Sequence, residues 1–347
     1  MTNPTASLRS KLVILLIMLS AFTAASGPIL PVSSAVLLYS QQFAPWRDPS
    51  PHSVQFVSVD RNVRLEVLDW GGSGRPIVLL AGGGNTAHVF DEFAPKLTAD
   101  CHVYGITRRG FGASSDPASG YGADRLGDDV LAVLDSLKLD RPVLVGHSLG
   151  GEELSSVATR HPDRVAGLVY LEAGYQYAFD NGKGTTLEEI GKIAGPQPPP
   201  PGESDLASFR ALQAYYLRCD GFTIPEAEYR QEWDSTPDGR VGKRRNFPDA
   251  IMKGMKKYTD ITVPALVVFA IPHDQGPWVN NSTDAKVREA AKAYSAADVV
   301  LTERQAKAFE NGVPSARVVR LPAHHYVYLS NEADVLREMH SFLAGLQ

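Results

Sequence analysis

Short apolar runs alternate with amphipathic stretches along most of the chain. Continuous runs such as residues 76–81 and 143–145 are typical of strands that are covered on both faces. Leu126, Val130 and Leu134 recur at helical spacing and predict a helix between two such strands. Because strands and helices alternate, we expect parallel strands joined by right-handed crossovers, which is an α/β architecture.

The same pattern places the other elements of the expected core. Two alternating stretches flank a polar turn and predict a hairpin at a sheet edge. The further strands and the helices that cover them follow from apolar runs and helical stripes. The expected strands are 54–59, 63–68, 102–106, 165–171, 264–270 and 316–321, and the expected helices begin near 87 and span 150–161, 284–311 and 332–346.

The alternation stops between residues 175 and 260. A Pro-rich connector at 196–202 is followed there by no clear strand, but by three amphipathic helices near 206–216, 226–233 and 249–258. A helical insertion between two strands of a parallel sheet is typical of a lid, and a purely structural excursion is the alternative. We therefore expect a core of residues 53–174 and 261–347 and a helical cap of residues 175–260.

Residues 1–35 have the composition of a targeting segment. Two basic residues precede an apolar run at 12–21, and small residues follow it. The run is shorter than the roughly 20 residues that a membrane span needs. We expect an exported protein, secreted or periplasmic, with cleavage near Ala25 or Ala35, and an uncleaved N-terminal anchor is the alternative.

Composition narrows the classes of partner. The chain has 347 residues, 44% of them hydrophobic, which is enough for a large core. Its net charge of -5 and the lack of a basic stripe argue against nucleic acid as a partner. Cys101 and Cys219 lie in different predicted segments, so free or buried thiols are expected rather than a disulfide. No metal-ligand spacing is present in the sequence.

Residues 146–150 read Gly-His-Ser-Leu-Gly and lie between a predicted strand and a predicted helix. This arrangement fits the G-x-S-x-G turn that holds a serine nucleophile above a sheet. Ser148 would present its hydroxyl there, and the amide of Leu149, at the start of the helix, would face a developing oxyanion. An ordinary glycine-rich loop is the alternative interpretation.

A second glycine-rich loop follows the strand at 76–81. Three consecutive glycines, residues 82–84, leave backbone amides unshielded where the second oxyanion donor of a serine hydrolase is expected. We assign this role to the amide of Gly83. No phosphate-binding glycine motif follows the strand, which argues against a nucleotide site.

A serine hydroxyl needs a base within hydrogen-bond reach, and the base needs a partner that fixes its tautomer. His325 follows the last predicted strand and is the expected base, with His324 as the alternative. Asp274 follows the preceding strand and is the expected acid. Glu172, which also ends a strand, is the alternative acid.

These motifs resemble the α/β-hydrolase fold family from about Val54 to Leu346. The resemblance is carried by residues 80–84, by Arg-Gly-Phe-Gly at 109–112, by the turn at Ser148 and by the late aspartate and histidine. It implies a mostly parallel eight-stranded sheet flanked by helices, a cap after the sixth strand, a Ser/acid/His triad and no cofactor.

Two positions depart from the family pattern. Ala81 stands where the family commonly has histidine, which affects the support of the oxyanion loop. Asp274 lies one residue further from its strand than is common in the family, so Glu172 stays open as the acid.

The nucleophile narrows the expected reaction. Family members that open epoxides or remove halides need an aspartate where this chain has Ser148. We therefore expect a carboxylic-ester hydrolase that acts on a small or medium-sized molecule through an acyl-enzyme. Amide hydrolysis, carbon–carbon hydrolysis and perhydrolysis share the triad and stay open, as does a ligand receptor on the same fold. The sequence carries no signal for the oligomeric state.

Overall fold

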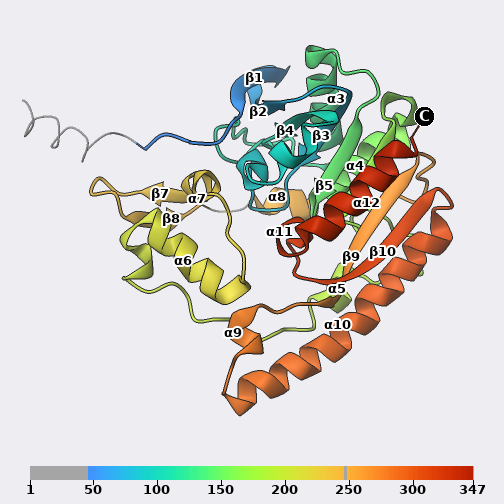
Figure 1. Cartoon of the computed structure of the whole chain (residues 1–347). Helices are drawn as coiled ribbons and strands as arrows, with labels where there is room; N and C mark the ends of the chain where they lie inside the picture. Colours follow the sequence, from blue (N-terminus) through green and yellow to red (C-terminus); the bar gives the residue numbers. More distant parts are fainter. Residues whose placement is uncertain (1–45, 246–247, 347) are drawn as a thin grey trace, which may run out of the picture. The chain divides into compact units, whose positions relative to one another are not determined.

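The computed structural model describes residues 46–245 and 248–346 (Figure 1). The chain divides into the units Met1–Pro49 and Ser50–Gln347, and the fold described below is that of the second unit. The expected targeting segment, residues 1–35, lies outside the described residues. Within the described ranges, no helix is both long enough and apolar enough to cross a membrane.

The core of the described chain is an eight-stranded sheet with the order β1-β2-β4-β3-β5-β6-β9-β10. Neighbouring strands from β4 to β10 are parallel, whereas β2 pairs antiparallel with both β1 and β4. The predicted mostly parallel sheet with a hairpin at its edge is confirmed. The strands are β1 (Ser53–Asp60), β2 (Val63–Gly71), β3 (Arg75–Leu80), β4 (Cys101–Ile106), β5 (Val143–His147), β6 (Gly167–Leu171), β9 (Ala265–His273) and β10 (Ala316–Ala323).

Helices cover both faces of the sheet, which explains the continuous apolar runs of its central strands. Every residue of β5 and β6 is buried. One face packs against α3 (Ala123–Leu137), α4 (Gly150–Arg160) and α10 (Ala285–Gly312). The other packs against η1 (Ala87–Phe90), η2 (Ala94–Leu97), α11 (Val327–Ser330) and α12 (Glu332–Ala344). A short η3 (Pro162–Arg164) joins α4 to β6. In Figure 1, α10 and α12 lie alongside β9, which both contact.

A long insertion separates β6 from β9. Three of its helices are those predicted near 206–216, 226–233 and 249–258, although the last is shorter than expected. The expectation of an insertion without strands is wrong, because Trp233–Ser235 and Val241–Arg244 form an antiparallel hairpin. The elements are α5 (Leu187–Ile190), η4 (Asp205–Ala207), α6 (Phe209–Asp220), α7 (Glu226–Glu232), β7 (Trp233–Ser235), β8 (Val241–Arg244) and α8 (Asp249–Lys253), and α9 (Pro277–Asn280) follows β9.

The two cysteines lie in different parts of this fold. Cys101 begins β4 and Cys219 lies near the end of α6. Both are buried and both are free thiols. The prediction of unpaired, buried cysteines is therefore confirmed.

Candidate active site

Ser148 lies in the sharp turn between β5 and α4. Its backbone has a φ of 48°, in the left-handed region that residues with a side chain rarely adopt. The flanking glycines permit the turn. A Cβ on Gly146 would lie 2.7 Å from Cδ1 of Leu154, and one on Gly150 would lie 2.6 Å from the carbonyl oxygen of Leu80. The predicted strand–turn–helix unit therefore forms, with its serine at the end of a buried strand.

The two predicted oxyanion donors come from different segments, one from the start of a helix and the other from a loop. Leu149 is the N-cap of α4, at the helix end where unpaired amides and the helix dipole favour negative charge. Gly83 is exposed in the loop after β3 and lines a cavity of about 390 Å³. This loop passes close to the nucleophile, since a Cβ on Gly82 would lie 3.1 Å from Cβ of Ser148.

Arg108 donates hydrogen bonds to the backbone of this glycine-rich loop. Its Nη2 donates to the carbonyl oxygen of Ala81 at 2.7 Å, and its Nη1 donates to that of Gly82 at 3.3 Å. Nε and Nη2 also pair with the carboxylate of Glu153 on α4, at 2.7 and 2.8 Å. A guanidinium bridge therefore supports the loop in a chain that has Ala81 where the family commonly has histidine.

The insertion also contacts this loop and the residues that follow it. Asn85 Nδ2 donates to Glu232 Oε1 at 2.7 Å and to Glu228 Oε1 at 3.1 Å, both on α7. Glu228 also accepts from the amide and the hydroxyl of Thr86. Tyr326 completes the network, because its hydroxyl donates to Asn85 Oδ1 at 3.0 Å. Burial, and then the proximity of the two carboxyls, raises the pKa of Glu228, so the pair retains a proton at neutral pH.

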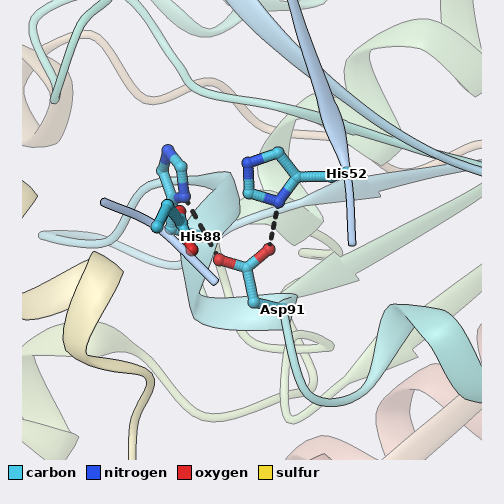
Figure 2. A group of neighbouring side chains, drawn as sticks. His52, His88 and Asp91 are labelled. Carbon is cyan, nitrogen blue, oxygen red and sulfur yellow. Dashed lines mark hydrogen bonds and ion pairs between the residues drawn. The ribbon is translucent and has the colours of Figure 1, made fainter. Parts of the chain in front are cut away.

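A buried cluster fixes η1, the element that follows this loop (Figure 2). His52 Nδ1 lies 2.7 Å from one carboxylate oxygen of Asp91, and His88 Nδ1 lies 3.2 Å from the other. The Nε1–H of Trp70 donates to the same carboxylate at 3.1 Å. The cluster joins η1 to the lead-in of β1 and to β2, so it stabilises the segment that carries the glycine loop.

The expected base, His325, faces the alternative acid. His325 follows β10, and its Nδ1 lies 3.1 Å from Oε2 of Glu172. The carboxylate of Asp274 instead accepts from the amide of Gly276 at 3.0 Å and from Nδ2 of Asn280 at 2.7 Å. The structure therefore pairs His325 with Glu172. Asp274, the acid preferred from the sequence, bonds instead to residues of its own loop.

His324, the alternative base, has a different environment. Its Nδ1 accepts from the amide of Tyr326 at 3.3 Å, and its own amide donates to the hydroxyl of Ser330 at 3.1 Å. Burial, and then the neighbouring His325, lowers the pKa of His324 to about 4. The ring is therefore neutral at neutral pH and acts as part of the loop that carries His325.

Glu172 is the most heavily bonded carboxylate of the site. It is completely buried. One oxygen accepts from the amide of Ala270 at 2.8 Å, the other faces His273 Nε2 at 2.9 Å, and the hydroxyl of Tyr175 reaches both. Burial opposes its charge, but His273 and His325 together hold the pKa of Glu172 far below its ordinary value. The carboxylate is therefore ionised and fixed in place at neutral pH.

Two clusters among the described residues have a spacing that could hold a metal ion. One contains His52, His88 and Asp91, and the other contains Glu172, His273 and His325. In each cluster the imidazole nitrogens already face carboxylate oxygens at hydrogen-bond distances. Shared protons therefore account for the geometry of both.

The sequence matches a known protein family along most of its length. A profile of the Alpha/beta hydrolase family matches residues 77–338. The chain belongs to the alpha/beta hydrolase family. The predicted fold class is thereby confirmed, and the protein is placed among hydrolases.

Curated relatives of this alpha/beta hydrolase act on different bonds. The chain is 26% identical over 286 residues to 2-(acetamidomethylene)succinate hydrolase of Mesorhizobium japonicum, which covers 78% of this chain and 89% of that protein. It is 37% identical over 118 residues to epoxide hydrolase A of Mycobacterium tuberculosis, but this match spans only 33% of this chain and 37% of the relative. The crystal structure of E-2-(acetamidomethylene)succinate hydrolase superposes with a TM-score of 0.58 at 21% identity, over 85% of this chain and all of that one.

Sequence analysis missed two residues of this hydrolase that contact the candidate triad. Tyr177 is buried, and its side chain interacts with that of Ser148. His273 was not assigned a role, yet it contacts Glu172. The signal for Tyr177 was its position five residues after a strand-ending carboxylate, and the signal for His273 was its position at the end of β9.

His147, inside the nucleophile motif, orients the loop of the base. Its Nε2 lies 3.1 Å from the carbonyl oxygen of His325, and the centroids of the two imidazole rings are 4.9 Å apart. Burial, and then His325, holds the pKa of His147 well below its usual value, so the ring is neutral. A neutral ring that donates from Nε2 fixes the backbone of residue 325 relative to the turn at Ser148.

Proposed function

We propose that this hydrolase cleaves a carboxylic ester through an acyl-enzyme, with Ser148 as nucleophile, His325 as base and Glu172 as the acid that orients the base. The hydrogen bond of 3.1 Å between His325 Nδ1 and Glu172 Oε2 carries the proposal. A carboxylate on Nδ1 fixes the tautomer in which Nε2 is free to take a proton, which is the requirement of a Ser/His/acid triad.

The reaction proceeds in two halves. Ser148 attacks the ester carbonyl carbon while Nε2 of His325 takes the hydroxyl proton, and the carbonyl electron pair moves to oxygen. The amides of Gly83 and Leu149 donate to this oxyanion. Collapse of the intermediate expels the alcohol, which receives the proton from His325. Water then attacks the acyl-enzyme by the same steps and releases the carboxylic acid.

The choice of an ester rests on the nucleophile and on the surroundings of the site. A serine forms an acyl-enzyme with esters, whereas epoxide opening in this fold needs an aspartate at the same position. The insertion between β6 and β9 would act as a cap over a small-molecule substrate. In support, α7 contacts the loop of Gly83, and residues 193–198 line a cavity of about 450 Å³ together with His325.

Hydrolysis of an amide-containing acid is the second candidate. It is favoured by the relative that aligns over 89% of its length, whose named substrate carries an acetamido group and two carboxylates. Both candidates use the same triad, so amide substrates have to be assayed beside the esters.

The test combines an active-site label with a substrate panel. We expect a fluorophosphonate to label wild-type protein but not Ser148→Ala, and p-nitrophenyl esters of increasing acyl length to be turned over only by wild type. Labelling without multiple turnover of any ester or amide would favour a ligand receptor instead. Equal labelling of Ser148→Ala would exclude Ser148 as the nucleophile.

We also propose that the protein is exported, from the targeting composition of residues 1–35. Expression in a bacterial host followed by N-terminal sequencing of the exported protein tests this. A mature N-terminus near residue 26 or 36 supports cleavage. Retention of the full-length protein in the cytoplasm would contradict export.

A further inference from the structure

His273 links the acid of the candidate triad to a second carboxylate. Its Nε2 lies 2.9 Å from Oε2 of Glu172, the same oxygen that faces His325, and its Nδ1 lies 2.7 Å from Oδ2 of Asp298 on α10. Both ring nitrogens of His273 therefore face carboxylate oxygens. A neutral imidazole has one N–H and could donate to only one of two ionised carboxylates, so this geometry favours the doubly protonated, cationic ring.

The surroundings strengthen this charge pattern. The side chain of Glu172 is fully buried, that of Asp298 is 8% exposed and that of His273 is 14% exposed, so water screens these charges weakly. Burial opposes the charge of His273, but the carboxylates of Glu172 and Asp298 overcome it and raise the pKa of His273 to about 10. The ring is then positively charged at every pH at which a serine hydrolase of this kind would work.

From this geometry we propose that His273 and Asp298 are positioning residues that extend the triad to Asp298–His273–Glu172–His325–Ser148. The inference rests on the proposed function. His273 keeps its proton throughout the reaction. It holds Oε2 of Glu172 in line with Nδ1 of His325 and partly offsets the negative charge that Glu172 presents to the base.

Other ionisable groups lie near these five residues and also affect how the activity depends on pH. Tyr175 donates to Glu172, and Tyr294 interacts with Asp298 from α10. The remaining groups lie around the cavity that His273 shares with His325. They are Asp220, whose pKa burial raises to about 6, and Asp274 and His324.

The charges predict opposite effects of two substitutions on the base. His273→Gln removes a positive charge near His325, so the protonated base becomes more stable and the acidic limb of activity moves to higher pH. Asp298→Asn removes a negative charge while Glu172 still holds His273 protonated, so the limb moves to lower pH. At the effective dielectric of partly buried sites we expect the acidic limb to move by about 0.5 to 1 pH unit in His273→Gln and by less in Asp298→Asn.

The experiment measures the second-order rate of fluorophosphonate labelling of Ser148 between pH 5 and 9, which needs no knowledge of the natural substrate. The full-length protein is compared with His273→Gln and Asp298→Asn, and with Glu289→Gln, which removes an exposed charge from the same helix. Thermal unfolding and circular dichroism check that each variant is folded. If His273→Gln does not fold, the shift of Asp298→Asn alone decides the matter.

Opposite displacements of the acidic limb in the two variants, with no displacement in Glu289→Gln, are the expected result. Slower labelling with an unchanged limb in both folded variants would reduce the pair to a structural role and overturn this inference alone. Absence of labelling of the wild type at any pH would overturn the proposed function, and the inference with it.

Discussion

Two side chains of the candidate site lie on left-handed backbone at the ends of neighbouring strands. Ser148 follows β5 with a φ of 48°, and Glu172 follows β6 with a φ of 52°. In the ladder between these strands His147 pairs with Leu171, so the next residues on each strand are Ser148 and Glu172. A residue with a side chain pays on the order of 1 kcal/mol for this conformation. Such strain concentrates at functional sites, where the surrounding structure holds it in place.

Glu172→Gln is expected to reduce kcat by about 10²- to 10⁴-fold, because an amide on Nδ1 no longer stabilises the charged imidazole and can select the wrong tautomer. The matched change, Asp274→Asn, is expected to leave kcat within about 3-fold, since an amide keeps most of the acceptor role toward Gly276. Ester turnover of the two folded variants decides between them. Near-normal turnover in Glu172→Gln, with loss in Asp274→Asn, would restore Asp274 as the acid.

Arg108→Met is expected to slow acylation by about 10- to 100-fold, because the carbonyls of Ala81 and Gly82 lose their donor and the oxyanion loop loses its support. It also leaves Glu153 buried without its partner, a loss of about 3–5 kcal/mol in the free energy of unfolding. The double variant Arg108→Met/Glu153→Met should recover most of the stability but not the rate. Recovery of both in the double variant would show that the loop does not depend on Arg108.

Sequence could predict which loops meet at the site, but not which carboxylate turns toward the base. Asp274 and Glu172 both follow buried strands that end at the same edge of the sheet. Asp274 has a short side chain that bonds to the amide two residues later, a local competition that a pattern of strands does not reveal. Glu172 reaches His325 because its backbone is left-handed, and the sequence around Glu172 does not predict this conformation.

At the scale of elements, α7 joins the insertion to the loop of the oxyanion donors. The carboxyls of Glu228 and Glu232 converge on Asn85, and Arg244 of β8 pairs with Glu232 at 3.1 Å. The hairpin that sequence analysis missed therefore contributes to this contact. Its strands are three and four residues long, mostly exposed and rich in charge, so they lack the apolar run by which the core strands were found.

The acidic pair of α7 makes the contact dependent on pH. Because burial raises the pKa of Glu228 in the folded protein, its stabilising contribution is complete below the ordinary pKa of a glutamate and is lost as pH rises through the folded value. We expect the Tm of wild type to fall between about pH 5 and 8, the interval from the ordinary pKa of a glutamate to the folded value, and to fall less in Glu228→Gln, which cannot ionise. Glu226→Gln, half-exposed on the same helix, is the control and should keep the wild-type slope. An equal slope in Glu228→Gln would contradict the assignment.

At the scale of the whole molecule, the sheet and its two layers were the most predictable features. Buried parallel strands must be apolar on both faces, so their sequence pattern is strong, and their alternation with helices permits few connections. The contacts that join distant segments were not predictable in this way. The pairing of α7 with Asn85 and of His273 with Asp298 depends on side-chain directions in the folded chain.

The buried, separate thiols predict a protein whose stability is independent of reducing agents. Ellman's reagent should react with Cys101 and Cys219 only after unfolding, and dithiothreitol should leave the Tm unchanged. Thiol titration with and without guanidinium chloride measures this. A Tm that falls by several degrees in dithiothreitol, together with no thiols after unfolding, would indicate a disulfide.

Because the proposed acid lies at the end of β6, the loop after β9 can be changed without altering the proposed triad. The segment from Gln275 to Asp284 follows β9 but holds none of the groups assigned to proton transfer, while the preceding His273 only steadies them. Surface segments of this kind tolerate replacement. New loops grafted there could alter which molecules enter the neighbouring cavity and leave the chemistry of the nucleophile intact, so selectivity and reactivity can be engineered separately in this enzyme.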